Sequence, residues 1–335
     1  MHGMILAAGL GTRLRPVTNH LPKALLPVVN IPLIEYALPS LVAAGVELIG
    51  VNLCHLGAKV RGFLQQTRVV DPARFVFSSE PELLGTAGGI KRLARILGGE
   101  SFFIHNADML ASVDARSLID HHRRSGAVVT LAVAPPAACE RPTLALVPDG
   151  SVTDMLGLVH GCASEVDFLG LCVIEASFVA RLPEHGCLVR DALVPYLREG
   201  GRVAAWVHQG YARDVGTPAR WLRAQADLLA GRLTLPEPLA TRYETACRRQ
   251  PLMAAETQII PPVAAGLHTC IAERSTVGPG VCLGEGVRVG RGCCLRHALV
   301  LDDTVISDHA IIEHAIVGPE GILSAEEGSG GPMRE

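Results

Sequence analysis

The chain has 335 residues, enough for two domains, and its hydrophobic fraction of 49% is sufficient for packed cores. The net charge is −3, and no block of Lys and Arg residues favours a nucleic-acid partner or a cationic membrane-binding helix. No run of 18 apolar residues predicts a transmembrane helix. The ten cysteines include no Cys-x-x-Cys pair, so we expect reduced thiols. These features predict a soluble, cytoplasmic protein without membrane insertion.

Strand and helix patterns alternate along the first 231 residues. Short apolar runs predict strands over residues 4–8, 48–53, 101–105, 127–133 and 203–207. Apolar residues at helical spacing predict helices over residues 32–44 and 217–231. Residues 1–231 are therefore expected to form an α/β domain with a Rossmann-like, mostly parallel sheet and flanking helices. Residues 232–262 contain five prolines and weak periodicity, so we expect a connector there.

A six-residue period follows the connector. One apolar track comprises Ile271, Val277, Leu283, Val289, Leu295 and Leu301, and a second comprises Val281, Val287, Cys293, Leu299, Val305, Ile311 and Val317. Such a period is typical of a parallel β-helix, in which each face of a coil supplies inward side chains to a shared core. We expect about three coils over residues 263–320, at roughly 18 residues a coil. The tail, residues 321–335, is expected to be flexible.

A glycine-rich turn follows the first predicted strand. Gly9 and Gly11 would let backbone N–H groups approach a phosphate closely, and Thr12 and Arg13 add hydroxyl and guanidinium donors. Lys23 would supply a point charge. The turn is not a Walker loop, because no Gly-Lys-Ser/Thr ending follows it. It also lacks the dinucleotide-binding fingerprint, because a leucine occupies the position of the third glycine.

The turn resembles the signature of the sugar-1-phosphate nucleotidyltransferases (NDP-sugar pyrophosphorylases). Residues 9–16 read Gly-Leu-Gly-Thr-Arg-Leu-Arg-Pro, and a Pro-Lys pair follows at residues 22–23. The segment Glu80–Gly89 resembles the family's loop around the nucleobase and the sugar. Asn106-Ala-Asp108 and Asp214-Val-Gly resemble its two metal-binding segments. The resemblance also implies that the C-terminal repeat is a left-handed β-helix, as in the mannose-1-phosphate guanylyltransferase branch.

The resemblance implies a role for each matching residue. Arg13 and Lys23 would be catalytic, and Asp108 and Asp214 would bind Mg²⁺. The nucleotide would be bound by Ala8, Gly9, Gly11, Thr12, Arg13, Glu80, Gly85, Thr86 and Ala87. The sugar would be bound by Asn106 and Gly170, and Arg190 and Arg213, which match no family motif, are added as sugar-binding candidates.

The sequence departs from the family pattern in the region that binds the sugar phosphate. Many members carry Glu-Lys-Pro there, but Asp149–Gly157 contains no lysine, and none occurs after residue 91. Arg190 or Arg213 would have to replace that cation. Ala212 occupies a position where many relatives have tryptophan. The absence of Glu-Lys-Pro also fits the N-acetylmuramate-1-phosphate uridylyltransferase branch, and the segment Val51–Gly57 resembles that branch.

Together these patterns predict Mg²⁺-dependent transfer of a nucleotidyl group from a nucleoside triphosphate to a sugar-1-phosphate, with release of pyrophosphate. Guanylyl transfer to mannose-1-phosphate is favoured, and uridylyl transfer to N-acetylmuramate-1-phosphate is the alternative. A different class, a non-catalytic sugar-nucleotide-sensing or assembly subunit, also remains open. Acyl transfer by the β-helix is disfavoured because few coils are predicted. The β-helix is expected to pack on the catalytic domain or to build a homo-oligomer.

Overall fold

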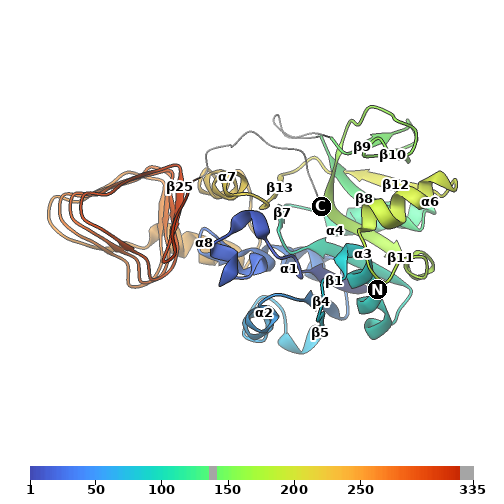
Figure 1. The fold of residues 1–335 in the computed structure, drawn as a ribbon, viewed down its shortest axis with the longest axis horizontal. Helices are drawn as coiled ribbons and strands as arrows, with labels where there is room; N and C mark the ends of the chain where they lie inside the picture. The colour runs from blue at the N-terminus through green and yellow to red at the C-terminus, as the bar shows by residue number, and fades with distance from the viewer. Residues whose placement is uncertain (136–141, 325–335) are drawn as a thin grey trace. The chain divides into compact units, whose positions relative to one another are not determined.

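The computed structural model describes residues 1–135 and 142–324 (Figure 1). The chain forms two compact units, of which the first comprises residues 1–10, 22–25 and 33–213. The second comprises residues 11–21, 26–32 and the chain from residue 214 onward. This division differs from the predicted boundary at residue 231, because α7 (Pro218–Leu229) belongs to the second unit. Within the described ranges, no helix is both long and apolar enough to cross a membrane.

A seven-stranded sheet forms the centre of the first unit. In spatial order its strands are β12 (Val203–Val207), β8 (Val129–Ala134), β11 (Asp167–Glu175), β6 (Ser101–Asn106), β1 (His2–Leu6), β4 (Ile49–Leu53) and β5 (Phe75–Ser79). All neighbours are parallel except β11, which runs antiparallel to both β6 and β8. The prediction of a mostly parallel α/β sheet is confirmed, although the apolar runs did not predict β5 and β11.

Helices flank this sheet, and two short ribbons accompany it. The helices are α1 (Leu33–Ala43), α2 (Gly57–Leu64), α3 (Gly85–Leu97), α4 (Ala115–Ser125), α5 (Ala176–Val179) and α6 (Val194–Arg198). One ribbon pairs β9 (Leu144–Leu146) with β10 (Val152–Met155), and the other pairs β7 (Met109–Ala111) with the first-unit part of β13 (Ala212–Asp214).

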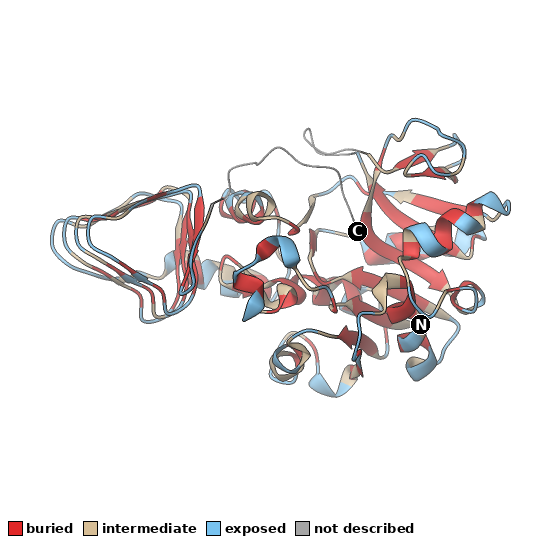
Figure 2. Cartoon of the chain, in the orientation of Figure 1, coloured by how far each residue is buried: buried red, intermediate tan, exposed pale blue. Residues whose placement is uncertain are grey.

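The sheet is buried on both of its faces (Figure 2). Side chains alternate between the faces along β1, so that Met4 joins the core with Ile90 of α3 while Ile5 joins the core with Ile34 of α1. A ligand can approach such strands only at their ends. In open parallel sheets the carboxyl ends of the strands form the usual binding edge.

The second unit contains a stack of parallel coils (Figure 1). Its three sheets are β14-β17-β20-β23, β15-β18-β21-β24 and β16-β19-β22-β25-β26. The strands are β14 (Leu252–Met253), β15 (Gln258–Ile259), β16 (Val263–Ala265), β17 (Cys270–Ile271), β18 (Thr276–Val277), β19 (Val281–Leu283), β20 (Arg288–Val289), β21 (Cys294–Arg296), β22 (Leu299–Val300), β23 (Val305–Ile306), β24 (Ile311–Glu313), β25 (Ala315–Gly318) and β26 (Gly321–Ser324). Strands from successive coils pair in parallel in all three sheets, and only β26 runs antiparallel, to β25. This pairing confirms the β-helix, and its left hand stays a prediction.

The coils begin earlier than the six-residue period indicates. The predicted connector, residues 232–262, contains helix α8 (Leu239–Arg248) and also β14 and β15, which belong to the first coil. Each sheet consequently holds four parallel strands, one coil more than predicted. Prolines and polar residues interrupt the apolar period in this coil, which conceals it in the sequence. Of the predicted flexible tail, residues 321–324 form β26, and residues 325–335 lie outside the described part of the chain.

The second apolar track is wrong in its last coil. Val305 and Ile311 are 70% and 80% exposed, whereas their neighbours Ile306 and Ile312 are each 4% exposed. The register explains the change, because Leu295 pairs with Val277, 18 residues earlier, but with Ile312, only 17 residues later. One residue is missing from the corner that follows β21, so Ile306 and Ile312 pair with the inward residues Val289 and Leu295 of the preceding coil. Val305 and Ile311 pair with Arg288 and Cys294, which are not core residues.

One face of the coil stack is covered by other parts of the second unit. The outward-facing side chain of Cys282 on β19 is fully buried, and its Sγ lies 3.2 Å from Oδ1 of Asn30. The Asn30 amide also donates to the carbonyl of Leu283 at 3.0 Å. Asn30 belongs to the ribbon of β2 (Pro27–Val28) and β3 (Ile31–Pro32), and Trp221 of α7 donates to the carbonyl of Pro27 at 2.7 Å. The β-helix therefore packs on segments from within residues 1–231.

Adjacent isoleucines provide a test of the shortened corner. We expect Ile312→Ala to destabilise the second unit by about 2–5 kcal/mol, because it opens a cavity in the coil core. Ile311→Ala should change stability by less than about 0.5 kcal/mol, because its side chain is exposed. Chemical denaturation of the intact chain measures both. A larger loss of stability for Ile311→Ala than for Ile312→Ala would contradict the shortened corner and support an uninterrupted six-residue period.

Candidate functional site

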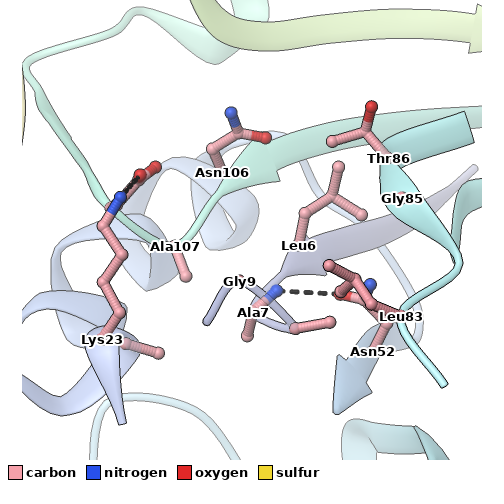
Figure 3. A pocket seen from close by; sticks show the side chains of 13 residues that line it. Leu6, Ala7, Gly9, Lys23, Asn52, Leu83, Gly85, Thr86, Asn106 and Ala107 are labelled. Atoms are coloured by element: carbon pink, nitrogen blue, oxygen red, sulfur yellow. Dashed lines mark hydrogen bonds and ion pairs between the residues drawn. The ribbon is translucent and has the colours of Figure 1, made fainter. Parts of the chain in front are cut away.

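A cavity of about 200 Å³ lies at the carboxyl ends of β1, β4 and β6 (Figure 3). Its wall comprises Leu6, Ala7, Ala8, Gly9, Lys23, Ala24, Asn52, Leu83, Gly85, Thr86, Asn106, Ala107 and Asp108. Seven residues assigned to the site from the sequence meet here, all from the first unit: Ala8, Gly9, Lys23, Gly85, Thr86, Asn106 and Asp108. Parallel strands explain the convergence, because their carboxyl ends lie along one edge of the sheet.

Lys23 and Asp108 form an ion pair in the cavity wall (Figure 3). Lys23 begins a single 3₁₀ turn, and Asp108 follows directly after β6. The two side chains are only 14% and 27% exposed, so the pair is partly shielded from water. An incoming phosphate would offer Lys23 a second anionic partner and would leave the Asp108 carboxylate available to a cation. The arrangement therefore suits the binding of a phosphate together with a cation.

Asn106 and Gly170 lie against each other. Gly170 has φ +71°, and a Cβ added there would lie 2.5 Å from Nδ2 of Asn106. A side chain at residue 170 would therefore displace the Asn106 amide from its place in the wall. Gly170 lies where the pairing of β11 with β8 is interrupted, between Phe168 and Cys172.

The loop that begins α3 is held by a second segment of the chain. Gly85 has φ +73°, and a Cβ there would lie 2.3 Å from the carbonyl oxygen of Gly186. The Thr86 hydroxyl accepts a hydrogen bond from the N–H of Leu188 at 2.7 Å. Arg190 follows two residues later in the helical turn Leu188–Leu193, but it is exposed and is not part of the cavity wall.

Two first-unit residues assigned to nucleotide binding are not in the cavity wall. Glu80 is 4% exposed, and its carboxylate accepts hydrogen bonds from Nδ2 of Asn52 at 2.9 Å and from the N–H of Leu84 at 3.1 Å. Ala87 is fully buried, and its N–H donates to the carbonyl of Gly186 at 2.9 Å. Asn52, which sequence reasoning missed, does line the cavity. Its only sequence signal is its position near the end of a predicted strand.

The remaining predicted residues next to the glycine turn belong to the second unit. Gly11 has φ +63°, and its carbonyl accepts a hydrogen bond from the Thr18 hydroxyl at 2.8 Å. Thr12 and Arg13 follow and are exposed at the start of a 3₁₀ turn.

Arg213 belongs to the first unit, of which it is the last residue. It is half-buried and is not in the cavity wall.

Asp214 lies in a cluster that only the structure reveals. Its carboxylate forms an ion pair with Arg220 of α7, a residue that the sequence did not single out. A Cβ added at Gly216 would lie 2.6 Å from Oδ2 of Asp214 and 3.0 Å from Nη2 of Arg13. The glycine therefore allows these two predicted site residues to approach the same point.

The two candidate metal-binding carboxylates each already balance a cation. The described residues contain no group of three or more His, Cys, Asp or Glu side chains arranged to hold a metal ion. That donor set does not suit a cage made entirely of protein ligands. A single carboxylate such as Asp108 suits Mg²⁺, which commonly uses one or two protein carboxylates together with substrate phosphates and water.

His105 lies beneath the cavity wall and is fully buried. Burial lowers the pKa of His105 to about 4, although a hydrogen bond to the Asn106 carbonyl and the nearby Asp108 charge act in the opposite direction. The imidazole is therefore neutral near pH 7. We expect no role for it as a proton donor at physiological pH.

Asp154 occupies the region where many relatives carry the phosphate-binding lysine. It is fully buried on β10, and its carboxylate accepts hydrogen bonds from the N–H groups of Val159, His160 and Cys162 at 2.9–3.1 Å. Burial alone would raise the pKa of Asp154, but these donors outweigh it and lower the pKa. Asp154 therefore closes a loop and does not face a phosphate.

Comparison with known proteins supports the resemblance. The family model described as nucleotidyl transferase matches residues 2–142, and the model described as GMPPB C-terminal domain matches residues 259–325. The mannose-1-phosphate guanylyltransferase of Mycobacterium tuberculosis is 27% identical over 83% of this chain and 76% of its own length. The N-acetylmuramate alpha-1-phosphate uridylyltransferase of Neisseria meningitidis serogroup B is 34% identical over 69% of this chain and 99% of its own length.

A solved structure shares the fold. HddC from Yersinia pseudotuberculosis superposes with a TM-score of 0.58 at 23% identity, over 68% of this chain and all of HddC. The nucleotidyl transferase model and the 34% identical relative together establish the class of protein. The chain belongs to the sugar-1-phosphate nucleotidyltransferase family.

The low pKa of Asp154 predicts a specific pH dependence. A carboxyl whose pKa is lower in the folded state stabilises the fold above its unfolded pKa of about 4. That contribution is lost as the pH falls through the lower folded value. We expect Asp154→Asn to lower the thermal midpoint at pH 7, and the difference from wild type to shrink below about pH 4. Thermal unfolding between pH 2 and 8 measures this, and a constant difference would contradict the assignment.

Two glycines with similar φ angles allow the effect of backbone strain to be distinguished from the effect of contact with Asn106. Gly170→Ala and Gly157→Ala both place a side chain at positive φ, +71° and +68°, but only residue 157 has open space around it. Both variants should lose about 1–2 kcal/mol of stability. Only Gly170→Ala should also lower nucleotidyl transfer, by about 10-fold or more, because it displaces Asn106. Pyrophosphate release by the two purified variants tests this. Equal activities would show that the position of Asn106 does not affect nucleotidyl transfer.

Proposed function

We propose that this chain transfers a guanylyl group from GTP to mannose-1-phosphate. The observation that carries the proposal is the cavity at the ends of β1, β4 and β6, where a glycine-rich turn lies beside the Lys23–Asp108 ion pair. Support for the sugar and the base comes from the relatives. The guanylyltransferase of Mycobacterium tuberculosis aligns with 83% of the chain, and the GMPPB C-terminal model matches the coils at residues 259–325.

The proposed reaction needs no covalent enzyme intermediate. A phosphate oxygen of the sugar phosphate forms a bond to the α-phosphorus of the triphosphate. The bond between the α-phosphorus and the oxygen that links it to the β-phosphorus breaks. Pyrophosphate leaves with the electron pair of that bond. Both reactants are anions, so the protein acts mainly by neutralising charge and by holding the two phosphates in line.

Each group of site residues has a separate role in the proposed reaction. The backbone of Gly9 and Gly11 would bind the triphosphate, and Lys23 would exchange the Asp108 carboxylate for phosphate oxygens. Arg13 would neutralise charge on the leaving pyrophosphate. Asn106, held in place by Gly170, would orient the sugar, while Arg190 and Arg213 are proposed to contact its phosphate. Mg²⁺ held by Asp108 and Asp214 would add positive charge at the reacting phosphate oxygens.

Uridylyl transfer to N-acetylmuramate-1-phosphate is a second candidate. One observation favours it, since the Neisseria relative with that name is 34% identical over 99% of its length. That alignment covers 69% of this chain and leaves the remainder unmatched. The match of the coils to the GMPPB C-terminal model favours the guanylyl reaction.

A substrate matrix separates these candidates. Purified chain and Mg²⁺ would be incubated with each of four nucleoside triphosphates and with mannose-1-phosphate, glucose-1-phosphate or N-acetylmuramate-1-phosphate, and pyrophosphate release would be measured. We expect the greatest release with GTP and mannose-1-phosphate and its loss on addition of EDTA. Greatest release with UTP and N-acetylmuramate-1-phosphate would support the second candidate. No release from any pair, with nucleotide binding retained, would indicate a non-catalytic sugar-nucleotide sensor.

Substitutions in the cavity test the proposed mechanism. We expect Lys23→Ala and Asp108→Ala each to lower turnover by about 10²–10³-fold, the usual scale for one electrostatic group at a reacting centre. Lys59→Ala is the matched control, because Lys59 is exposed on α2 and is not part of the cavity wall. Steady-state rates at saturating substrates measure the effect, with circular dichroism to verify folding. Near-wild-type rates for the two cavity variants would contradict the mechanism.

A further inference from the structure

Two polar side chains beneath the cavity connect its opposite walls. Oδ1 of Asn52 accepts a hydrogen bond from the N–H of Ala7 at 2.8 Å, in the wall formed by the glycine-rich turn. Nδ2 of Asn52 donates to Oε1 of Glu80 at 2.9 Å, and Oε2 of Glu80 accepts from the N–H of Leu84 at 3.1 Å. Leu84 lies between Leu83 and Gly85, which belong to the other wall. One continuous chain of hydrogen bonds therefore joins the two walls.

The pair is enclosed and tightly packed. Asn52 and Glu80 are 3% and 4% exposed. A Cβ added at Gly89 of α3 would lie 2.6 Å from Nδ2 of Asn52 and 3.0 Å from Oε1 of Glu80. Buried polar groups must retain their partners, because each unpaired one carries the full cost of its lost hydration. The separation between the Ala7–Gly9 turn and the Leu83–Thr86 loop is therefore set by this pair.

We propose that Asn52 and Glu80 are positioning residues that fix the distance between the phosphate-binding turn and the loop that starts α3, so that nucleotide affinity depends on the pair. The inference rests on the proposed function, because it assumes that the cavity binds a nucleoside triphosphate. It gives Glu80 a role other than direct contact with the nucleotide. Glu80 acts through Asn52 and Leu84, on which the spacing of the walls depends.

The pair allows a test by exchange of donor and acceptor. In Asn52→Asp, two buried carboxylates would face each other at the position of the present 2.9 Å hydrogen bond. In Glu80→Gln, one amide oxygen cannot accept from both Asn52 and Leu84 in the present geometry, so one donor loses its acceptor. In the double variant Asn52→Asp/Glu80→Gln, the new carboxylate can accept from Ala7 and from the new amide, whose oxygen can accept from Leu84. All the hydrogen bonds are then restored with the same shape and net charge.

The measurement is the equilibrium dissociation constant for GTP, determined by titration calorimetry on the intact chain at a temperature where all variants are folded. UTP replaces GTP if the substrate matrix selects uridylyl transfer. We expect each single variant to weaken binding by about 10–100-fold, and the double variant to recover to within a few-fold of wild type. We also expect KM for the triphosphate to rise in the single variants while KM for the sugar phosphate changes little. A purely structural role would not separate the two KM values.

A second buried glutamate provides the control. Glu35 of α1 is 2% exposed and accepts a hydrogen bond from the Thr67 hydroxyl at 3.1 Å, and neither residue is in the cavity wall. Glu35→Gln should lower the thermal midpoint without weakening nucleotide binding. Wild-type affinity in both Asn52→Asp and Glu80→Gln, or no recovery in the double variant, would overturn the inference alone. A wild-type chain that binds no nucleoside triphosphate would overturn the proposed function and the inference with it.

Discussion

The site depends on the parallel register of three strands. Leu6 at the end of β1 pairs with Asn52 on β4 and with Asn106 on β6, so the two asparagines lie on either side of it. Parallel hydrogen bonding fixes this alignment, and burial of both faces of the sheet keeps it from slipping by one residue. The glycine turn after β1 and Asp108 after β6 consequently begin from the same edge. Every candidate residue of the first unit is placed relative to that edge.

Charge balance is a second constraint on the site. Asp108 is paired with Lys23 in the first unit, and Asp214 is paired with Arg220 in the second. A carboxylate that is partly buried needs a nearby cation, because the loss of water is otherwise costly. In the proposed reaction, bound phosphate groups would take over these cations, and the carboxylates would then become available to a metal ion. The protein therefore contains, already paired with one another, the positive and negative charges that its proposed reaction needs.

The coils show how a short local change alters a repeating fold. The corner after β21 is one residue shorter than the equivalent corner of the preceding coil, so Ile306 and Ile312 come to lie opposite the inward residues Val289 and Leu295, while residues 305 and 311 are exposed. The stack tolerates this because each coil contacts only its neighbours, so the pairing continues with a new offset. The first coil lacks a clear period because prolines and polar residues interrupt its apolar positions, although its strands pair with those of the next coil.

The sequence by itself determined the fold class and the family, and it predicted seven of the residues that line the first-unit cavity. Apolar runs mark buried strands, a six-residue period marks coils, and glycines before Lys23 mark a phosphate turn, because each signal is local in the chain. Only the tertiary structure decided which polar residues support the site. Asn52 pairs with Glu80 across 28 residues and with Ala7 across 45 residues, and such distant pairings leave no trace in local spacing. Burial likewise decided that Asp154 closes a loop, because its three backbone donors surround it only after the chain has folded.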